Sequence, residues 1–361
     1  MQFNDVLTIK NGRNQRAVEN PNGKYPIYGS GGVMGYADDY ICNANTVVIG
    51  RKGSINNPIF VDRPFWNVDT AFGLEANTDL LMPRYLYYFC KHFNFEKLNK
   101  TVTIPSLTKA DLLKIEIDLP DLSTQQLVVS RLAKIERLIL LRKQELQKLD
   151  ELVKARFVEM FGDPENNTLH WTEQPLSDHL DVVGGYAFKS DKFVEDGIPV
   201  LRIGNINAGF FKPVNLVFWD DDEALSRYKM YPGDLVMSLT GTVGKDDYGN
   251  VCILGNDFDE YYLNQRNAKL KLKESINKYY LSTLLKFEPI KKKLTGISRG
   301  VRQANISNKD ILNLIVPIPE ISKQNEFEQF VKQLDKSKVV VQKALDEAQI
   351  LFDSLMQQYF G

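Results

Sequence analysis

The chain has 361 residues, of which 43% are hydrophobic and 25% are charged, an ordinary composition for a globular protein. Its 45 lysines and arginines nearly balance its 46 aspartates and glutamates, so the chain as a whole lacks the strong basic charge of many nucleic-acid-binding proteins. Met1–Lys10 has no leader pattern and no apolar run approaches the roughly 20 residues of a membrane span, so the sequence predicts a cytoplasmic protein without membrane contact.

Residues 1–122 are predicted to form a first globular domain. Asp5–Leu7 is followed by Gly12, and Tyr25-Pro26 comes next. An apolar strand then begins at Val47 and runs into the glycine turn Gly50–Ser54, and a helical pattern covers Pro83–Phe95. Short strands with frequent glycine and asparagine indicate a mixed α+β fold.

Basic and polar residues of this domain are candidates for contacts with phosphates or base edges. No acidic residue lies between Lys97 and Ala110, although this stretch contains several lysines. The expected contacts in the first domain are Arg51, Lys52, Ser54, Lys97 and Lys100.

A long helix is predicted over residues 123–161. Ser123 and Gln126 have the spacing of a capping box, so we expect the helix to begin at Thr124. Apolar residues then recur in steps of four and three, as in the seam of a coiled coil. The predicted seam residues are Val128, Leu132, Ile135, Ile139, Leu146, Leu149 and Val153.

Residues 163–321 repeat the plan of the first domain with a different sequence. Asp178–Leu180 with Gly185 and Ile198-Pro199 parallel features of the first domain. An apolar strand runs from Leu235 into a second glycine turn that ends at Lys245, and a helical pattern covers Asn277–Phe287. A second stretch without acidic residues lies between Pro289 and Lys309. The expected contacts of this domain are Thr240, Thr242, Lys245, Gln265, Arg266, Lys291, Lys292, Lys293, Arg299, Arg302 and Gln303.

Residues 104–162 recur at residues 303–361 without insertion or deletion, at a constant offset of 199. Asp111, Pro120 and Gln125, for example, recur as Asp310, Pro319 and Gln324. The repeat therefore contains a second long helix, over residues 322–361. Its predicted seam residues are Phe327, Val331, Leu334, Val341, Leu345, Phe352 and Leu355.

Two helices of this length are too long for both to be packed within one compact core, since a globular helix averages about 11–12 residues. We expect them to pair in antiparallel fashion, because the chain builds a whole domain between them. The sequence therefore predicts a pseudo-twofold α+β protein in which two globular domains are separated by a two-helix coiled coil.

Catalytic and metal-binding patterns are missing from the sequence. Three cysteines and three histidines are widely spaced, which argues against disulfides and against a zinc site. The turn Gly241–Lys245 resembles a phosphate-binding loop, but Leu239 stands where that motif needs glycine. No Glu-x-Lys or Asp-x-Lys nuclease triplet occurs. We expect no catalytic residue and no bound metal.

Two dissimilar regions that alternate with two similar long helices resemble the specificity subunit of type I restriction-modification enzymes. The motifs that carry the resemblance are Leu119–Gln126, Ile318–Asn325 and the helix ends Met-Phe-Gly and Tyr-Phe-Gly. The resemblance covers essentially the whole chain. The resemblance implies two target-recognition domains, at residues 1–122 and 163–321, that read a bipartite double-stranded DNA target. It also implies that the helices set the spacer and dock two methyltransferase subunits, and that translocating restriction nuclease subunits join the complex. S-adenosylmethionine, ATP and magnesium would then bind the partner subunits, and this chain would need no cofactor.

Other interpretations remain open at this point. A structural coiled-coil adaptor would explain the helices, and an autonomous DNA-modifying enzyme would explain contacts with DNA. A specificity subunit that serves an orphan methyltransferase without a nuclease would have the same sequence features. Basic stretches without any effect on DNA affinity would favour the coiled-coil adaptor. Binding of S-adenosylmethionine by the isolated chain would favour the autonomous enzyme.

Overall fold

The computed structural model describes the whole chain except residues 100–104, 243–244, 246 and 297–302. It divides into two compact units. Unit 1 comprises Met1–Gln144 and Val341–Gly361, and unit 2 comprises Glu145–Val340. Among the described helices, none is both long and apolar enough to cross a membrane.

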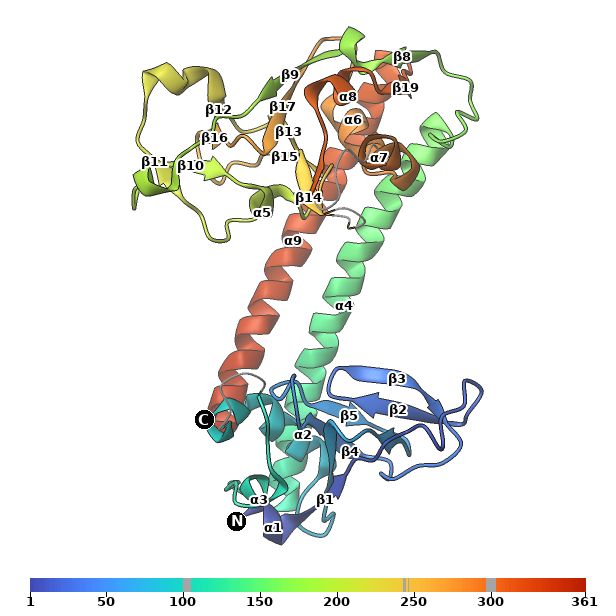
Figure 1. Cartoon of the computed structure of the whole chain (residues 1–361), viewed down its shortest axis with the longest axis vertical. Helices are drawn as coiled ribbons and strands as arrows, with labels where there is room; N and C mark the ends of the chain where they lie inside the picture. Colours follow the sequence, from blue (N-terminus) through green and yellow to red (C-terminus); the bar gives the residue numbers. More distant parts are fainter. Residues whose placement is uncertain (100–104, 243–244, 246, 297–302) are drawn as a thin grey trace. The chain divides into compact units, whose positions relative to one another are not determined.

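Unit 1 contains two small sheets (Figure 1). The first has the strand order β1-β7-β4-β5 and the second has the order β3-β2-β6. The strands are β1 (Leu7–Asn11), β2 (Tyr25–Gly29), β3 (Gly32–Ala37), β4 (Thr46–Gly50), β5 (Ile59–Val61), β6 (Trp66–Asn67) and β7 (Ala71–Ala76).

The helices of unit 1 include parts of both long helices. Its shorter helices are α1 (Phe3–Val6), α2 (Pro83–His92) and α3 (Lys109–Leu112), with a 3₁₀ turn at Phe95–Leu98. The long helices are α4 (Leu122–Phe161) and α9 (Ile321–Phe360), of 40 residues each. Tyr85 and Tyr88 of α2 form edge contacts with Phe360 and Phe352 of α9, so the end of α9 completes the core of unit 1.

Unit 2 contains a larger set of strands. Its main sheets have the orders β15-β13-β17-β9 and β11-β10-β16-β12, and two further pairs are β14-β18 and β19-β8. The strands are β8 (Glu173–Pro175), β9 (Leu180–Gly184), β10 (Ile198–Leu201), β11 (Phe218–Trp219), β12 (Lys229–Met230), β13 (Leu235–Ser238), β14 (Thr240–Thr242), β15 (Val251–Ile253), β16 (Tyr261–Leu263), β17 (Asn267–Leu272), β18 (Gln303–Asn305) and β19 (Ile315–Pro317).

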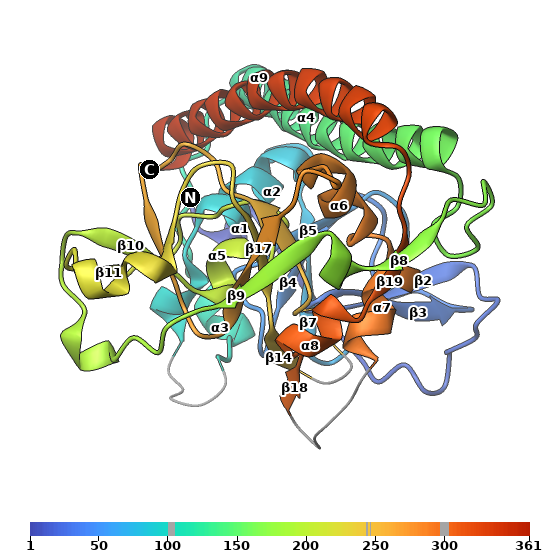
Figure 2. The ribbon, with the colours of Figure 1, turned by 90° about the horizontal axis from the view of Figure 1, so that it is seen from above.

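Aromatic side chains hold the helices of unit 2 together. The short helices are α5 (Ile203–Ile206), α6 (Lys278–Leu284), α7 (Glu288–Thr295) and α8 (Asn308–Leu312), with 3₁₀ turns at Leu176–Asp178, Ser190–Lys192 and Glu223–Tyr228. Phe157 of α4 stacks on Tyr280 of α6 and makes an edge contact with Phe327 of α9. Figure 2 shows α6 beneath the two long helices, as these contacts require.

The two units have the same framework, as the sequence parallels predicted. The sheets β1-β7-β4-β5 and β15-β13-β17-β9 are antiparallel with matching registers, and β2-β6 and β10-β16 are matching parallel pairs. The matched register pairs are Leu7–Ala76 with Leu180–Leu272, Val47–Leu74 with Leu235–Leu270, and Ile27–Trp66 with Val200–Tyr262. The expected strand and helix positions around Val47, Leu235, Pro83 and Asn277 are confirmed.

The long helices run antiparallel within each unit. In unit 1, Arg131 near the start of α4 donates to the hydroxyl of Tyr359 near the end of α9 (2.9 Å). In unit 2, Arg156 near the end of α4 donates to Glu326 near the start of α9 (3.1 Å). Nine seam residues are buried: Val128, Leu132, Ile135, Ile139, Val153, Phe327, Val331, Val341 and Phe352. The other five are half-buried: Leu146, Leu149, Leu334, Leu345 and Leu355.

The predicted capping box at the start of α4 is wrong. The helix begins at Leu122, and the carboxylate of Asp121 accepts hydrogen bonds from the Thr124 N–H (2.9 Å) and from the Ser123 hydroxyl. Gln126 is exposed, whereas Gln125 is fully buried. An aspartate that caps the backbone leaves the serine free to enter the first helical turn.

Gln125 and Gln324 make two equivalent hydrogen bonds in the two units, and Gln125 also donates to the Leu80 carbonyl (2.8 Å). Each side-chain oxygen accepts from the backbone N–H of the residue that caps a neighbouring helix, Met82 before α2 or Asn277 before α6, at 2.8 Å. Each side-chain nitrogen donates to a proline carbonyl, at 2.8 Å to Pro120 and 2.7 Å to Pro319. These repeated glutamines therefore join each long helix to its own domain.

All three cysteines are free and buried. Burial raises the pKa of the Cys42 and Cys252 thiols to about 12 and also raises that of Cys90. Because the thiolate is the reactive form, a thiol reagent such as DTNB at pH 8 should label none of them in the folded chain and all three after denaturation. Rapid labelling of any thiol in the native chain would contradict this prediction.

Candidate nucleic-acid interface

In unit 1, the glycine turn after β4 is fixed between two distant segments. The backbone N–H of Arg51 donates to the carbonyl of Thr70 (2.8 Å). On the other side, the Arg51 carbonyl accepts from Leu107 (2.9 Å), and the Gly53 N–H donates to Pro105 (3.1 Å). We call residues 51–54, 69–70 and 105–107 the paired turn of unit 1.

Unit 2 builds the same arrangement from other residues. The Leu239 N–H donates to the carbonyl of Arg266 (2.8 Å), and the Leu239 carbonyl accepts from Ile306 (2.8 Å). β14 then pairs with β18, with Thr240 opposite Asn305 and Thr242 opposite Gln303. We call residues 239–242, 265–266 and 303–306 the paired turn of unit 2. Figure 2 shows β14 and β18 on the face of unit 2 away from α4 and α9.

A carboxylate holds the loop of unit 2 in place. Asp247 accepts a hydrogen bond from the backbone N–H of Thr242 (2.8 Å), and this bond lowers the pKa of Asp247. Gly241 is required here, since an added Cβ would lie 2.2 Å from Oδ1 of Asp247. The carboxylate is therefore used to fix the loop.

The paired turns present different side chains to the solvent. Arg51, Lys52 and Ser54 are exposed in unit 1. Thr242, Lys245, Gln265 and Arg266 are exposed in unit 2. Thr240 is half-buried, and its hydroxyl oxygen has no hydrogen-bond partner within the described part of the chain. The structure thus brings Thr240, Thr242, Gln265 and Arg266 to one surface, although more than 20 residues separate the two pairs.

The lysines of α7 differ from the sequence expectation. Lys291 is buried, and its Nζ lies 2.5 Å from Oδ1 of Asn250, so it supports the loop that contains Asp247 instead of facing a phosphate. Lys292 pairs with Glu288 one helical turn away (2.6 Å), and Lys293 is exposed. Since residues on a helix face different directions, three adjacent lysines cannot form one contact surface.

The remaining expected contacts are divided between described and undescribed residues. Lys97 is exposed in the 3₁₀ turn Phe95–Leu98. Gln303 pairs through its backbone with Thr242. Lys100, Arg299 and Arg302 lie outside the described residues.

Asp69 and Thr70 are not among the contacts that the sequence predicts. They occupy the position in unit 1 that Gln265 and Arg266 occupy in unit 2, because the Thr70 and Arg266 carbonyls accept equivalent bonds. The signal lay in the two glycines Gly12 and Gly185, whose N–H groups donate to the first residue of β7 and β17, respectively. Alignment through these glycines would have matched the two turns.

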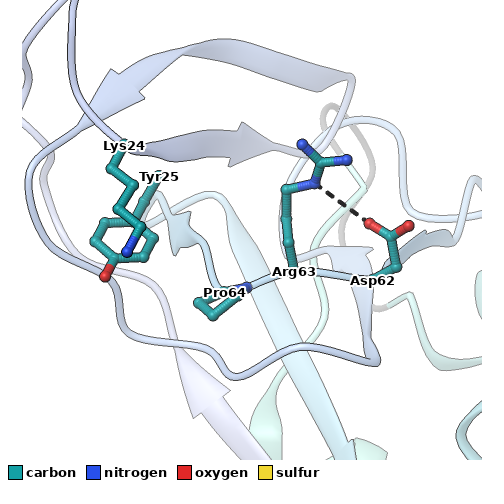
Figure 3. Close-up of a pocket in the computed structure, with 5 residues that line it drawn as sticks. All are labelled: Lys24, Tyr25, Asp62, Arg63 and Pro64. Carbon is teal, nitrogen blue, oxygen red and sulfur yellow. Dashed lines mark hydrogen bonds and ion pairs between the residues drawn. The ribbon is translucent and has the colours of Figure 1, made fainter.

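Three cavities in the described chain lie away from the paired turns. A hollow of about 320 Å³ in unit 1 is lined by Lys24, Tyr25, Asp62, Arg63 and Pro64, and Arg63 there pairs with Asp62 at 3.3 Å (Figure 3). Two others, of about 620 and 670 Å³, are lined by side chains of α2, α4 and α9 in unit 1 and by the β12–β13 region of unit 2. None of these three cavities is lined by a residue of the paired turns, where residues 51–54, Thr242, Gln265 and Arg266 are exposed. An exposed surface suits a large ligand better than an enclosed small molecule.

No group of three histidine, cysteine, aspartate or glutamate side chains suited to a metal ion occurs among the described residues. What the fold and the surface define is a tandem protein in which two equivalent α+β units present different polar and basic turns.

Comparison with known proteins identifies the class. Residues 1–151 and 169–348 match the type I restriction modification DNA specificity domain. The specificity subunit of the type I restriction enzyme MjaVIII from Methanocaldococcus jannaschii is 26% identical over 323 residues, covering 82% of this chain and 74% of that protein. The EcoKI specificity subunit from Escherichia coli is 22% identical over 338 residues, covering 85% and 70%.

A solved structure has the same fold. The type I restriction-modification S subunit from M. genitalium aligns with a TM-score of 0.61 at 18% identity, covering 100% of this chain and 95% of that one. The chain therefore belongs to the type I restriction-modification DNA specificity family, as a specificity subunit with two tandem recognition domains.

Proposed function

We propose that each unit reads one half of a bipartite DNA target through its paired turn, and that the chain itself performs no catalysis. The observation that carries this proposal is one framework with two sets of presented side chains. Arg51, Lys52 and Ser54 face the solvent from one paired turn, and Thr242, Gln265 and Arg266 face it from the other. Equivalent frames with different side chains are what two readers of different base sequences require.

In this proposal the chain acts within a larger complex. Two methyltransferase subunits dock on the outer faces of α4 and α9, which carry exposed apolar residues such as Leu138, Leu141, Val339 and Ile350. Such patches on a protein surface are typical of sites for other proteins. Translocating restriction nuclease subunits join this complex, and S-adenosylmethionine, ATP and magnesium bind the partners.

Arg266→Ala should change the base preference within one half-site and leave the other unchanged. A good contact between a side chain and a base edge contributes about 1–3 kcal/mol of discrimination, so the preference should fall by about 5- to 150-fold at the affected base pair. Lys52→Ala should act on the other half-site. The measurement is methylation of a randomised duplex library by the chain in complex with its methyltransferase.

Arg227→Ala is the matched control for Arg266→Ala. Arg227 is also exposed in unit 2, but it lines the cavity beside β12, away from the paired turn. Its loss should leave both half-sites unchanged. If Arg227→Ala and Arg266→Ala change the target equally, or neither changes it, the paired turn is not the reading surface.

A further inference from the structure

Gly31 and Gly204 occupy equivalent positions in the two units. The parallel pairs match Tyr28 of β2 with Leu201 of β10, because Tyr28 lies opposite Asn67 and Leu201 lies opposite Leu263. Each glycine follows its matched residue by three positions. The backbone beyond the strands differs: Gly31 lies in the turn between β2 and β3, and Gly204 lies in α5.

The fold of the chain does not require glycine at either position. An added Cβ at Gly31 or Gly204 would meet no atom within 4 Å, and neither residue has a φ in the left-handed region. Gly12 and Gly185 are different, since an added Cβ would lie 1.7 Å from the Val68 carbonyl oxygen and 2.1 Å from that of Asn264. Gly32 also has open space, but its φ of +122° accounts for the glycine.

Both open glycines lie beside the paired turns. In unit 1, an added Cβ on Gly50, the residue before the paired turn, would lie 3.1 Å from Cβ of Ser30, the neighbour of Gly31. In unit 2, Asn207 at the end of α5 donates to the carbonyl of Asp247 (2.6 Å), and the Asp247 carboxylate holds Thr242. In each unit the segment that carries the open glycine therefore contacts the loop of the paired turn, in unit 1 through Ser30 and in unit 2 through Asn207.

We infer that Gly31 and Gly204 are contact points at which the sugar-phosphate backbone of DNA approaches the main chain of each unit. Glycine is the residue that permits a ligand to come close to the protein backbone. The chain itself leaves the space at both glycines open, so a ligand can come close to the main chain there. This inference rests on the proposed reading of DNA by the paired turns, and it adds one position to each reading surface.

The test uses Gly31→Val and Gly204→Val in the complex of the chain with its methyltransferase. Each variant should keep the thermal unfolding temperature of the chain and its assembly with the methyltransferase, as judged by size-exclusion chromatography. Binding to the cognate duplex should weaken by about 10- to 100-fold, the effect expected when a hydrogen bond to a charged phosphate is lost. Ala224→Val, which enlarges an exposed residue of unit 2 elsewhere, should bind normally.

Duplexes with one half-site scrambled assign each effect to one unit. Scrambling the half-site of unit 1 should lower the DNA affinity of Gly31→Val by less than it lowers that of the unchanged chain. Scrambling the other half-site should lower the two affinities equally. Gly204→Val should show the reverse pattern. Unchanged DNA affinity would overturn the inference, and lost assembly would assign the open glycines to the methyltransferase. If either valine variant unfolds, the same measurements on the alanine variant decide. Arg266→Ala tests the reading surface separately, so the two proposals can fail independently.

Discussion

Gln324→Met should lower the free energy of unfolding of unit 2 by about 2–6 kcal/mol, since it leaves a buried N–H and a buried carbonyl without partners at about 1–3 kcal/mol each. The N–H belongs to Asn277 and donates to the side-chain oxygen of Gln324 (2.8 Å). The carbonyl belongs to Pro319 and accepts from the side-chain nitrogen of Gln324. Methionine keeps the length of the side chain, so the loss reports the hydrogen bonds and not a cavity. Gln125→Met should have a similar effect on unit 1.

Unfolding in denaturant, monitored by hydrogen exchange, assigns each decrease in the free energy of unfolding to one unit. Gln126→Met is the matched control, because this neighbour of Gln125 is exposed on the same helix. The control should change the free energy of unfolding by less than about 0.5 kcal/mol. Equal effects of Gln125→Met and Gln126→Met would show that the buried bonds contribute little to stability.

Lengthening both long helices by four residues should lengthen the unspecified spacer between the half-sites. The insertions are placed after Leu149 in α4 and after Lys338 in α9, beside the pair between Asp150 and Lys338 (2.8 Å). Four helical residues add about 6 Å, which equals at most about two base pairs of DNA. The seam tolerates the insertion as a stutter.

Genome-wide mapping of methylated sites in cells that carry the lengthened chain gives the spacer directly. The half-site bases should stay the same, since both paired turns are unaltered. The control is a four-residue insertion in the exposed loop after Asn166, outside both long helices, which should leave the spacer unchanged. Altered half-site bases with the original spacer would show that α4 and α9 do not set the distance.

The repeated half of the architecture was predictable from the sequence because it depends on local patterns. Steps of four and three place apolar residues on one side of a helix whatever it packs against. The start of α4 was misjudged by two residues, because Asp121 and Ser123 are both good capping residues. The contact of Gln125 with the distant Met82 N–H, which a sequence pattern does not contain, explains why that glutamine is buried.

The surface of the paired turns was only partly predictable, because hydrogen bonds between distant segments form it. Thr240 and Gln303 were both proposed, but only the pairing of β14 with β18 brings these two segments of backbone together. Lys291 was misjudged for the opposite reason. A run of lysines looks uniformly exposed in a sequence, whereas a helix turns one of them inward to Asn250.

The division of unit 1 between two segments of the chain affects how the protein is made. Phe352 and Phe360 pack in the core with Tyr85 and Tyr88, yet more than 250 residues separate them. On the ribosome, unit 1 must wait for Val341–Gly361 to emerge, whereas every segment of unit 2 has emerged before that point. A chain released from the ribosome before Val341 would therefore contain a complete unit 2 and an incomplete unit 1. The incomplete unit 1 would expose the apolar face of α2 to chaperones and proteases.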